Sequence, residues 1–129
     1  MTRISAARMD MEGGRVDNAV LKAYSETVNA IGNSTGAVAI NLTLGNVVTA
    51  TSTGITTWSV TNPAASGKCS SFVLILTNGG AFAQTWMSGI KWPGGTAPTL
   101  TASGVDVLCF FTINGGTTWR GVISETDSK

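Results

Sequence analysis

The sequence contains no histidine and little charge of either sign. Charged residues make up 12% of the 129 positions, against roughly 25% in an average globular chain. Without histidine, general acid–base catalysis would have to use carboxylates, lysine, tyrosine or cysteine. Asp106 is the only acid between Gly32 and Ile123, so this part of the chain cannot supply the carboxylate pair of a glycosidase. We therefore expect a non-enzymatic protein without a cofactor.

The few charges are unevenly distributed. Before Gly32 four bases balance four acids, whereas the long segment up to Ile123 carries only Lys68, Lys91, Asp106 and Arg120. With a net charge of +1 and no basic stripe, the chain lacks the phosphate contacts that nucleic-acid binding needs. A weakly charged surface also favours association. This composition is typical of a subunit that hides surface in an oligomer or a particle.

Long hydrophobic runs are absent too. No apolar run approaches the roughly 20 residues of a membrane-spanning helix, and the first residues lack the apolar stretch of a signal peptide. We expect neither membrane insertion nor export by the usual route.

Cysteine is scarce, with Cys69 and Cys109 the only thiols. Cys69 begins one expected strand and Cys109 lies in another, so a cross-strand disulfide and a pair of buried, reduced thiols both remain open. A metal site built from two cysteines without histidine is not favoured.

Two compositions meet near Gly32, and they divide the chain into an N-terminal segment, 1–31, and a domain, 32–129. The first segment is polar and holds three of the four methionines. Asp17 or Asn18 could cap a helix over 19–31, whose apolar residues recur near every 3.6 positions. So short a helix needs a cover for its apolar face, supplied by the domain or by neighbouring copies.

The sequence of the domain predicts a series of short strands separated by turn signals. It is rich in threonine, which suits pleated surfaces. Asn114-Gly115-Gly116 predicts a hairpin between 104–113 and 117–124. Residues 69–77 are apolar at both parities, which indicates a strand covered on both faces. The pattern predicts an all-β, antiparallel sandwich.

The aromatic residues have two readings, a packed core or a platform for stacking sugar rings. Trp58, Trp86 and Trp119 lie inside expected strands, which favours a core or subunit interface. Trp92 precedes a Pro-Gly-Gly loop and is the candidate for an exposed ligand contact. Asp106 is expected to accept structural hydrogen bonds at a sheet rim, from Lys91 or Arg120.

Three blocks resemble a known family. "KWPGGTAPTL" (91–100) and "NGGTTW" (114–119) are similar to blocks diagnostic of the repeated β-domain of tailed-bacteriophage tail fibre and related virion proteins, with Asn114 in place of the commoner Asp. The residues from Asp10 to Asn18 resemble the collar segment that precedes such domains. The resemblance covers about residues 9–124.

The resemblance implies a trimeric β-sandwich knob on the exterior of a phage virion. Its partners would be two sibling copies, another virion protein of the capsid, neck or tail, and a host cell-surface glycan. A short fibre or spike is the first reading, a capsid decoration or cement protein (head fibre) the second, and a free carbohydrate-binding module the third. Only eight residues precede the start of the resemblance at residue 9, and the two cysteines are unusual for the family. Both departures favour the second interpretation, a capsid decoration or cement protein.

Apolar side chains in the first segment are the candidates for anchoring to the virion or for trimer contact, because so short a segment cannot bury them by itself. These candidates are Met9, Met11, Val16, Val20, Leu21 and Tyr24.

Overall fold

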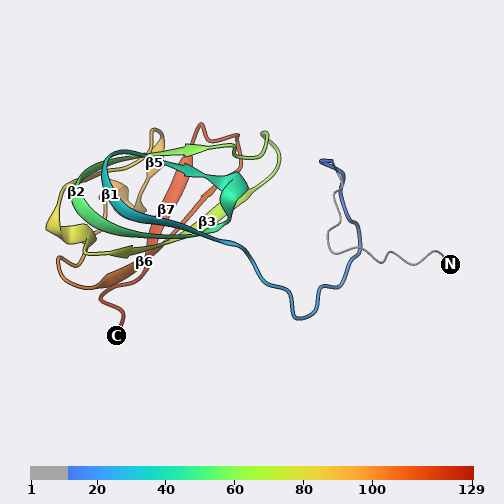
Figure 1. The fold of residues 1–129 in the computed structure, drawn as a ribbon. Helices are drawn as coiled ribbons and strands as arrows, with labels where there is room; N and C mark the ends of the chain where they lie inside the picture. The colour runs from blue at the N-terminus through green and yellow to red at the C-terminus, as the bar shows by residue number, and fades with distance from the viewer. Residues whose placement is uncertain (1–11) are drawn as a thin grey trace.

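The computed structural model describes residues 12–129, and they form a β-domain preceded by an extended segment (Figure 1). The predicted all-β class is confirmed, because the described chain contains strands and three short 3-10 helices but no α-helix. The strands are β1 (Val28–Asn41), β2 (Val47–Thr61), β3 (Ser70–Thr77), β4 (Gln84–Thr85), β5 (Ile90–Lys91), β6 (Val105–Thr112) and β7 (Trp119–Glu125). The 3-10 helices are η1 (Leu42–Leu44), η2 (Gly79–Ala81) and η3 (Pro93–Gly95).

The strands of residues 12–129 belong to one seven-stranded sheet, where the sequence had indicated the two sheets of a sandwich. Its order is β1-β2-β3-β6-β7-β5, and β4 pairs with β2 beside this path. The expectation of antiparallel pairing throughout is wrong. β3–β6 and β6–β7 are antiparallel, but β1–β2, β2–β3, β2–β4 and β5–β7 are parallel.

The parallel pairing of β1 with β2 depends on a bend in both strands. Only a short connection separates them, so β1 must curve back toward its own start. Its register shifts next to Gly32 and Gly36, which have φ of +81° and +67°, a conformation that glycine adopts without steric cost. Gly45, just beyond the end of β1, consequently packs against the backbone of Thr27, just before its start.

The same curvature carries β2 around the core. Its first half pairs with β3 and its second half with β4, so β2 contributes to two parts of the sheet. Thr53-Gly54, a dipeptide typical of turns, lies inside this continuous strand. Figure 1 shows β1 and β2 curving together at one end of the domain.

The core lies on the concave side of this sheet. Inward residues alternate along each strand, as in Phe72, Leu74 and Leu76 of β3. The buried apolar residues are Ile40, Val48, Ala50, Trp58, Phe72, Leu74, Leu76, Met87, Leu108, Phe110 and Trp119.

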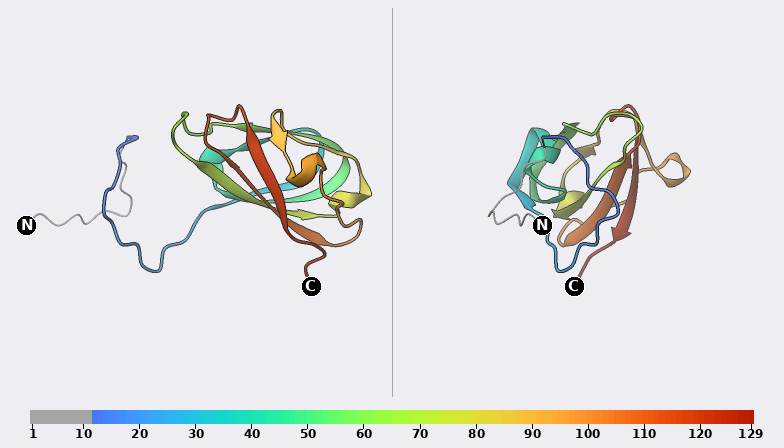
Figure 2. Two further views of the ribbon diagram at one scale, coloured as in Figure 1. Left: turned by 180° about the vertical axis from the view of Figure 1, so that it is seen from behind. Right: turned by 90° about the vertical axis from the view of Figure 1, so that its right-hand side faces the viewer.

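The helix expected over 19–31 is wrong. Residues 14–27 contain isolated bends but no helix, and Val28 already begins β1 opposite Val47. A short isolated helix is costly to nucleate, whereas residues 28–31 gain backbone hydrogen bonds by pairing with β2. In the left view of Figure 2 the segment before β1 runs clear of the domain.

The turn signals had mixed outcomes. The hairpin around Asn114 is confirmed, since Cys109 pairs with Val122 and Phe110 with Gly121. The similar sequence Asn78-Gly79-Gly80 forms no hairpin, because η2 follows Asn78 and β4 then pairs with β2.

Candidate interaction surfaces

The segment 12–27, here called the arm, has every residue exposed. Four of the six predicted anchoring residues lie in it, with exposed fractions of 61% for Val16, 93% for Val20, and 70% for both Leu21 and Tyr24. Met9 and Met11 lie outside the described residues. The structure thus leaves the arm's apolar side chains uncovered by their own domain.

A second exposed apolar surface lies on the convex side of the sheet. One row crosses five strands through successive pairings, Val28 with Val47, Val47 with Val73, Val73 with Cys109, and Cys109 with Val122. We call this row, together with its outward neighbours, the outer face. Its members are Val28, Val47, Val73, Ile75, Val107, Cys109, Phe111 and Val122.

These side chains are only partly covered. Val28, Phe111 and Val122 are 53%, 41% and 45% exposed, and the other five are half-buried. The expectation that the strand at 69–77 has both faces covered therefore holds for its inner face alone within residues 12–129. The apolar residues at both parities of β3 and β6 were the sequence signal for this surface.

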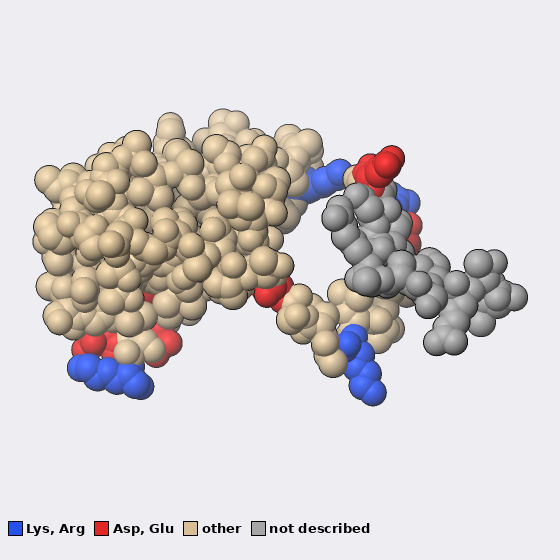
Figure 3. All heavy atoms as spheres, in the orientation of Figure 1, with Lys and Arg blue, Asp and Glu red and all other residues tan. Residues whose placement is uncertain are grey.

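Charged residues stand at the margin of the outer face. On β7, Arg120 pairs with Phe111 of β6, and Glu125 pairs with Val107 of β6. The central row itself carries no charge. Figure 3 shows that charged side chains gather on the arm and near the C-terminus, whereas the visible face of the domain carries almost none.

The cysteines do not form the disulfide considered from the sequence. Both are free thiols, Cys69 exposed and Cys109 half-buried. Cys109 lies opposite Val73, four residues along from Cys69, which corresponds to about 13 Å of strand. The view of both as buried thiols is also wrong, since Cys69 faces solvent.

Three tryptophans pack as predicted for a core. Trp58 and Trp119 are almost fully buried, and the half-buried Trp86 stacks on Trp58 with ring centroids 6.2 Å apart. Trp92 is half-buried and meets Trp86 and Phe110 edge-on, at 5.5 and 5.6 Å. Trp92 is therefore held in place by the core cluster rather than projecting freely.

The outer edge of Trp92 borders an open hollow of about 250 Å³, lined also by Lys91, Pro93, Arg120 and Gly121. Gly121 is needed here, because a Cβ at this position would lie 2.7 Å from the Trp92 ring. The hollow is smaller than the 300–1,000 Å³ typical of small-molecule sites. It offers one aromatic edge and two cationic side chains to solvent.

Asp106 has the structural role that the sequence suggested, but with other partners. It is completely buried. One carboxylate oxygen accepts hydrogen bonds from the Thr101 hydroxyl at 2.7 Å and the Asp127 N–H at 3.0 Å, and the other accepts from the Thr101 N–H at 2.7 Å. These hydrogen bonds do not involve Lys91 or Arg120, the partners expected from the sequence. Asp106 joins β6 to the preceding loop and to the C-terminal residues.

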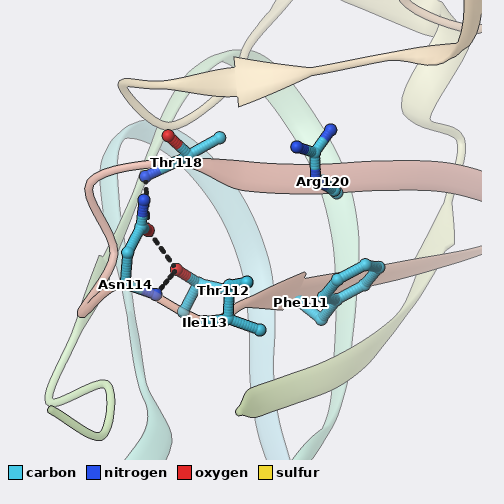
Figure 4. Close-up of a pocket in the computed structure, with 6 residues that line it drawn as sticks. All are labelled: Phe111, Thr112, Ile113, Asn114, Thr118 and Arg120. Atoms are coloured by element: carbon cyan, nitrogen blue, oxygen red, sulfur yellow. Dashed lines mark hydrogen bonds between the residues drawn. The ribbon is translucent and has the colours of Figure 1, made fainter. Parts of the chain in front are cut away.

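The Asn114 turn is a second polar cluster, drawn in Figure 4. The Asn114 Oδ1 accepts from the Thr112 hydroxyl at 3.0 Å and the Thr118 N–H at 2.9 Å. The Thr112 oxygen in turn accepts from the Gly116 N–H at 3.0 Å. The side chains thus satisfy the backbone of a turn in which Gly115 and Gly116 have positive φ.

We expect Asn114→Ala to lower the free energy of unfolding by about 1–2 kcal/mol, because the Thr118 N–H and the Thr112 hydroxyl lose their acceptor. Asn114→Asp keeps that oxygen and should remain within about 0.5 kcal/mol of the unmodified protein. Urea denaturation followed by tryptophan fluorescence measures both. Equal losses in the two variants would show that the acceptor oxygen does not stabilise the turn.

Within residues 12–129 no three histidine, cysteine, aspartate or glutamate side chains are grouped as metal ligands would be. None of the helices in the described part of the chain is long and apolar enough to cross a membrane. No protein-family model, curated protein or solved structure matches this chain.

Proposed function

We propose that this chain is a non-enzymatic structural protein on the exterior of a tailed-bacteriophage virion. It forms a short, fibre-like or spike-like trimeric knob that docks to another virion protein through its N-terminal segment. The observation that carries this proposal is the exposed arm, whose apolar side chains remain uncovered next to a well-packed, charge-poor β-domain. The blocks at 91–100 and 114–119 support the same assignment.

Burial of the uncovered side chains is the physical reason for assembly. Removing a valine, leucine or similar side chain from water stabilises a complex by about 1.5–3 kcal/mol. The arm and the outer face together expose enough apolar surface to favour association, and low net charge offers little repulsion against it. Light scattering should report the mass of three chains in solution.

Contact with a host surface is a further part of the proposal. The hollow beside Trp92 exposes an aromatic edge between Lys91 and Arg120, and aromatic rings suit contact with sugar rings. A capsid decoration protein would use the same arm and domain at higher copy number. Counting the chain per purified particle separates the two, with dozens to hundreds of copies favouring the shell.

The docking role is tested by deleting residues 1–18 and measuring incorporation into phage particles. We expect the shortened protein to fold but to be missing from purified particles, because the docking part of the arm is removed. Full-length Ile55→Ser is the matched control, since Ile55 is exposed in β2 and remote from the arm sequence. Incorporation of the shortened chain at the level of the control would overturn the docking role.

A further inference from the structure

We propose that the outer face binds the arm of a second copy, with Val20, Leu21 and Tyr24 as the contacting residues. The proposal rests on the self-association within the proposed function, and it names the surface and the segment that would carry it. The occupant is residues 16–24 of a neighbouring chain. The receiving surface is the convex side of β2, β3, β6 and β7.

The receiving surface is a sheet face without a cover. Val47, Val73, Cys109 and Val122 form an apolar row across adjacent strands, and Val122 remains 45% exposed. A soluble monomer rarely leaves a contiguous apolar patch of this kind on its surface, and such patches mark interaction sites. Ile75, Val107 and Phe111 widen the row on both sides.

The arm matches this surface in length and chemistry. Four interstrand spacings of about 4.8 Å make the row from β1 to β7 about 19 Å wide. Residues 16–24 span up to about 27 Å when extended, at about 3.3 Å per residue. Val16, Val20, Leu21 and Tyr24 fall within this span, whereas three of the arm's five charged residues, 12, 15 and 26, lie outside it.

The donor is another copy because the arm leaves its own domain. Pairing of Val28 with Val47 directs the chain along the strand axis, whereas the row runs across the strands. Figures 1 and 2 show the arm continuing away from the sheet, and the arm's own residues all remain exposed. In a closed ring each arm can cover the next copy, so that every outer face is used once.

Cys109 lies at the centre of the outer face and provides a built-in probe. In one chain, Cys69→Ser leaves Cys109 as the only thiol. In a second chain of distinguishable mass, Cys69→Ser and Cys109→Ser are combined with Leu21→Cys. The two chains are mixed, dissociated in mild denaturant, reassembled and oxidised gently. We expect a disulfide-linked heterodimer on a non-reducing gel, at least fivefold above the control pair.

The control replaces Leu21→Cys with Ile55→Cys, a site of similar exposure in the half of β2 that pairs with β4. Equal crosslinking by the two sites would overturn the proposal, as would no crosslinking of Leu21→Cys in a sample that light scattering reports as trimeric. A trimeric sample without this crosslink would reject the contact between arm and outer face but not the trimer itself. A monomeric mass for the unmodified protein would instead reject self-association altogether.

A second variant tests the same contact without introduced cysteines, in case the cysteine chains do not fold. Val122→Lys places a charge on the partly exposed outer face, which the folded domain tolerates, and it should weaken assembly at least tenfold. Ile55→Lys should leave the mass unchanged. Circular dichroism checks that both remain folded, and full assembly of folded Val122→Lys would also overturn the proposal.

Discussion

Replacement of Asp106 by alanine is expected to lower the free energy of unfolding by about 3–5 kcal/mol. The substitution leaves three partly buried donors without an acceptor, the N–H and hydroxyl of Thr101 and the N–H of Asp127. Each unsatisfied buried polar group costs about 1–3 kcal/mol, and the loop and C-terminal residues lose their common attachment to β6. Urea denaturation measures the loss.

Asp106→Asn is the matched comparison, because it keeps the shape and one acceptor oxygen. That amide oxygen can serve one or two of the three donors, so the loss should be about half that of Asp106→Ala. A loss below about 1 kcal/mol for the alanine variant would show that water replaces the carboxylate, and the structural role assigned to Asp106 would be wrong.

Phe110→Ala is expected to cost about 3–5 kcal/mol, the usual range for removing a buried phenylalanine side chain. Phe110 is 1% exposed. Its ring centroid lies 5.0 Å from that of Phe72, 5.5 Å from Trp86 and 5.6 Å from Trp92. The substitution opens a cavity at the centre of this cluster, so the tryptophan fluorescence of the folded state should also change.

Phe82→Ala tests whether burial accounts for that effect. Phe82 is 41% exposed and lies outside the outer face, so its removal should cost less than about 1.5 kcal/mol. Thermal unfolding of the two variants, compared at equal protein concentration, makes the measurement. Similar losses in the two variants would show that burial of the Phe110 ring does not account for the loss of stability.

Features governed by neighbouring residues could be predicted well. Asn114-Gly115-Gly116 specifies its own turn, because two glycines accept positive φ and the asparagine side chain bonds the turn backbone. The flanking strands β6 and β7 therefore occur where expected. Trp58 and Trp119 were assigned to a core or a subunit interface from their place inside strands, since large aromatic side chains gain most from burial.

Of the two candidate surfaces, only the apolar residues of the arm could be identified from the sequence. Val20, Leu21 and Tyr24 stood out because a short, otherwise polar segment could not bury them. The outer face was hidden, because a strand apolar at both parities looks the same whether its second face is covered or exposed. Val73 and Val122 share this face only through their separate pairings with Cys109.

By itself, the sequence determined the β class, the Asn114 hairpin, the low charge and the apolar residues of the N-terminal segment, since these follow from composition and from contacts a few residues apart. Only the tertiary structure decided that residues 28–31 extend β1 rather than a helix, and that β1 lies parallel to β2. Those outcomes depend on the bends at Gly32 and Gly36 and on the approach of Thr27 to Gly45. Backbone pairing between distant residues then outweighs the weak local preference for helix.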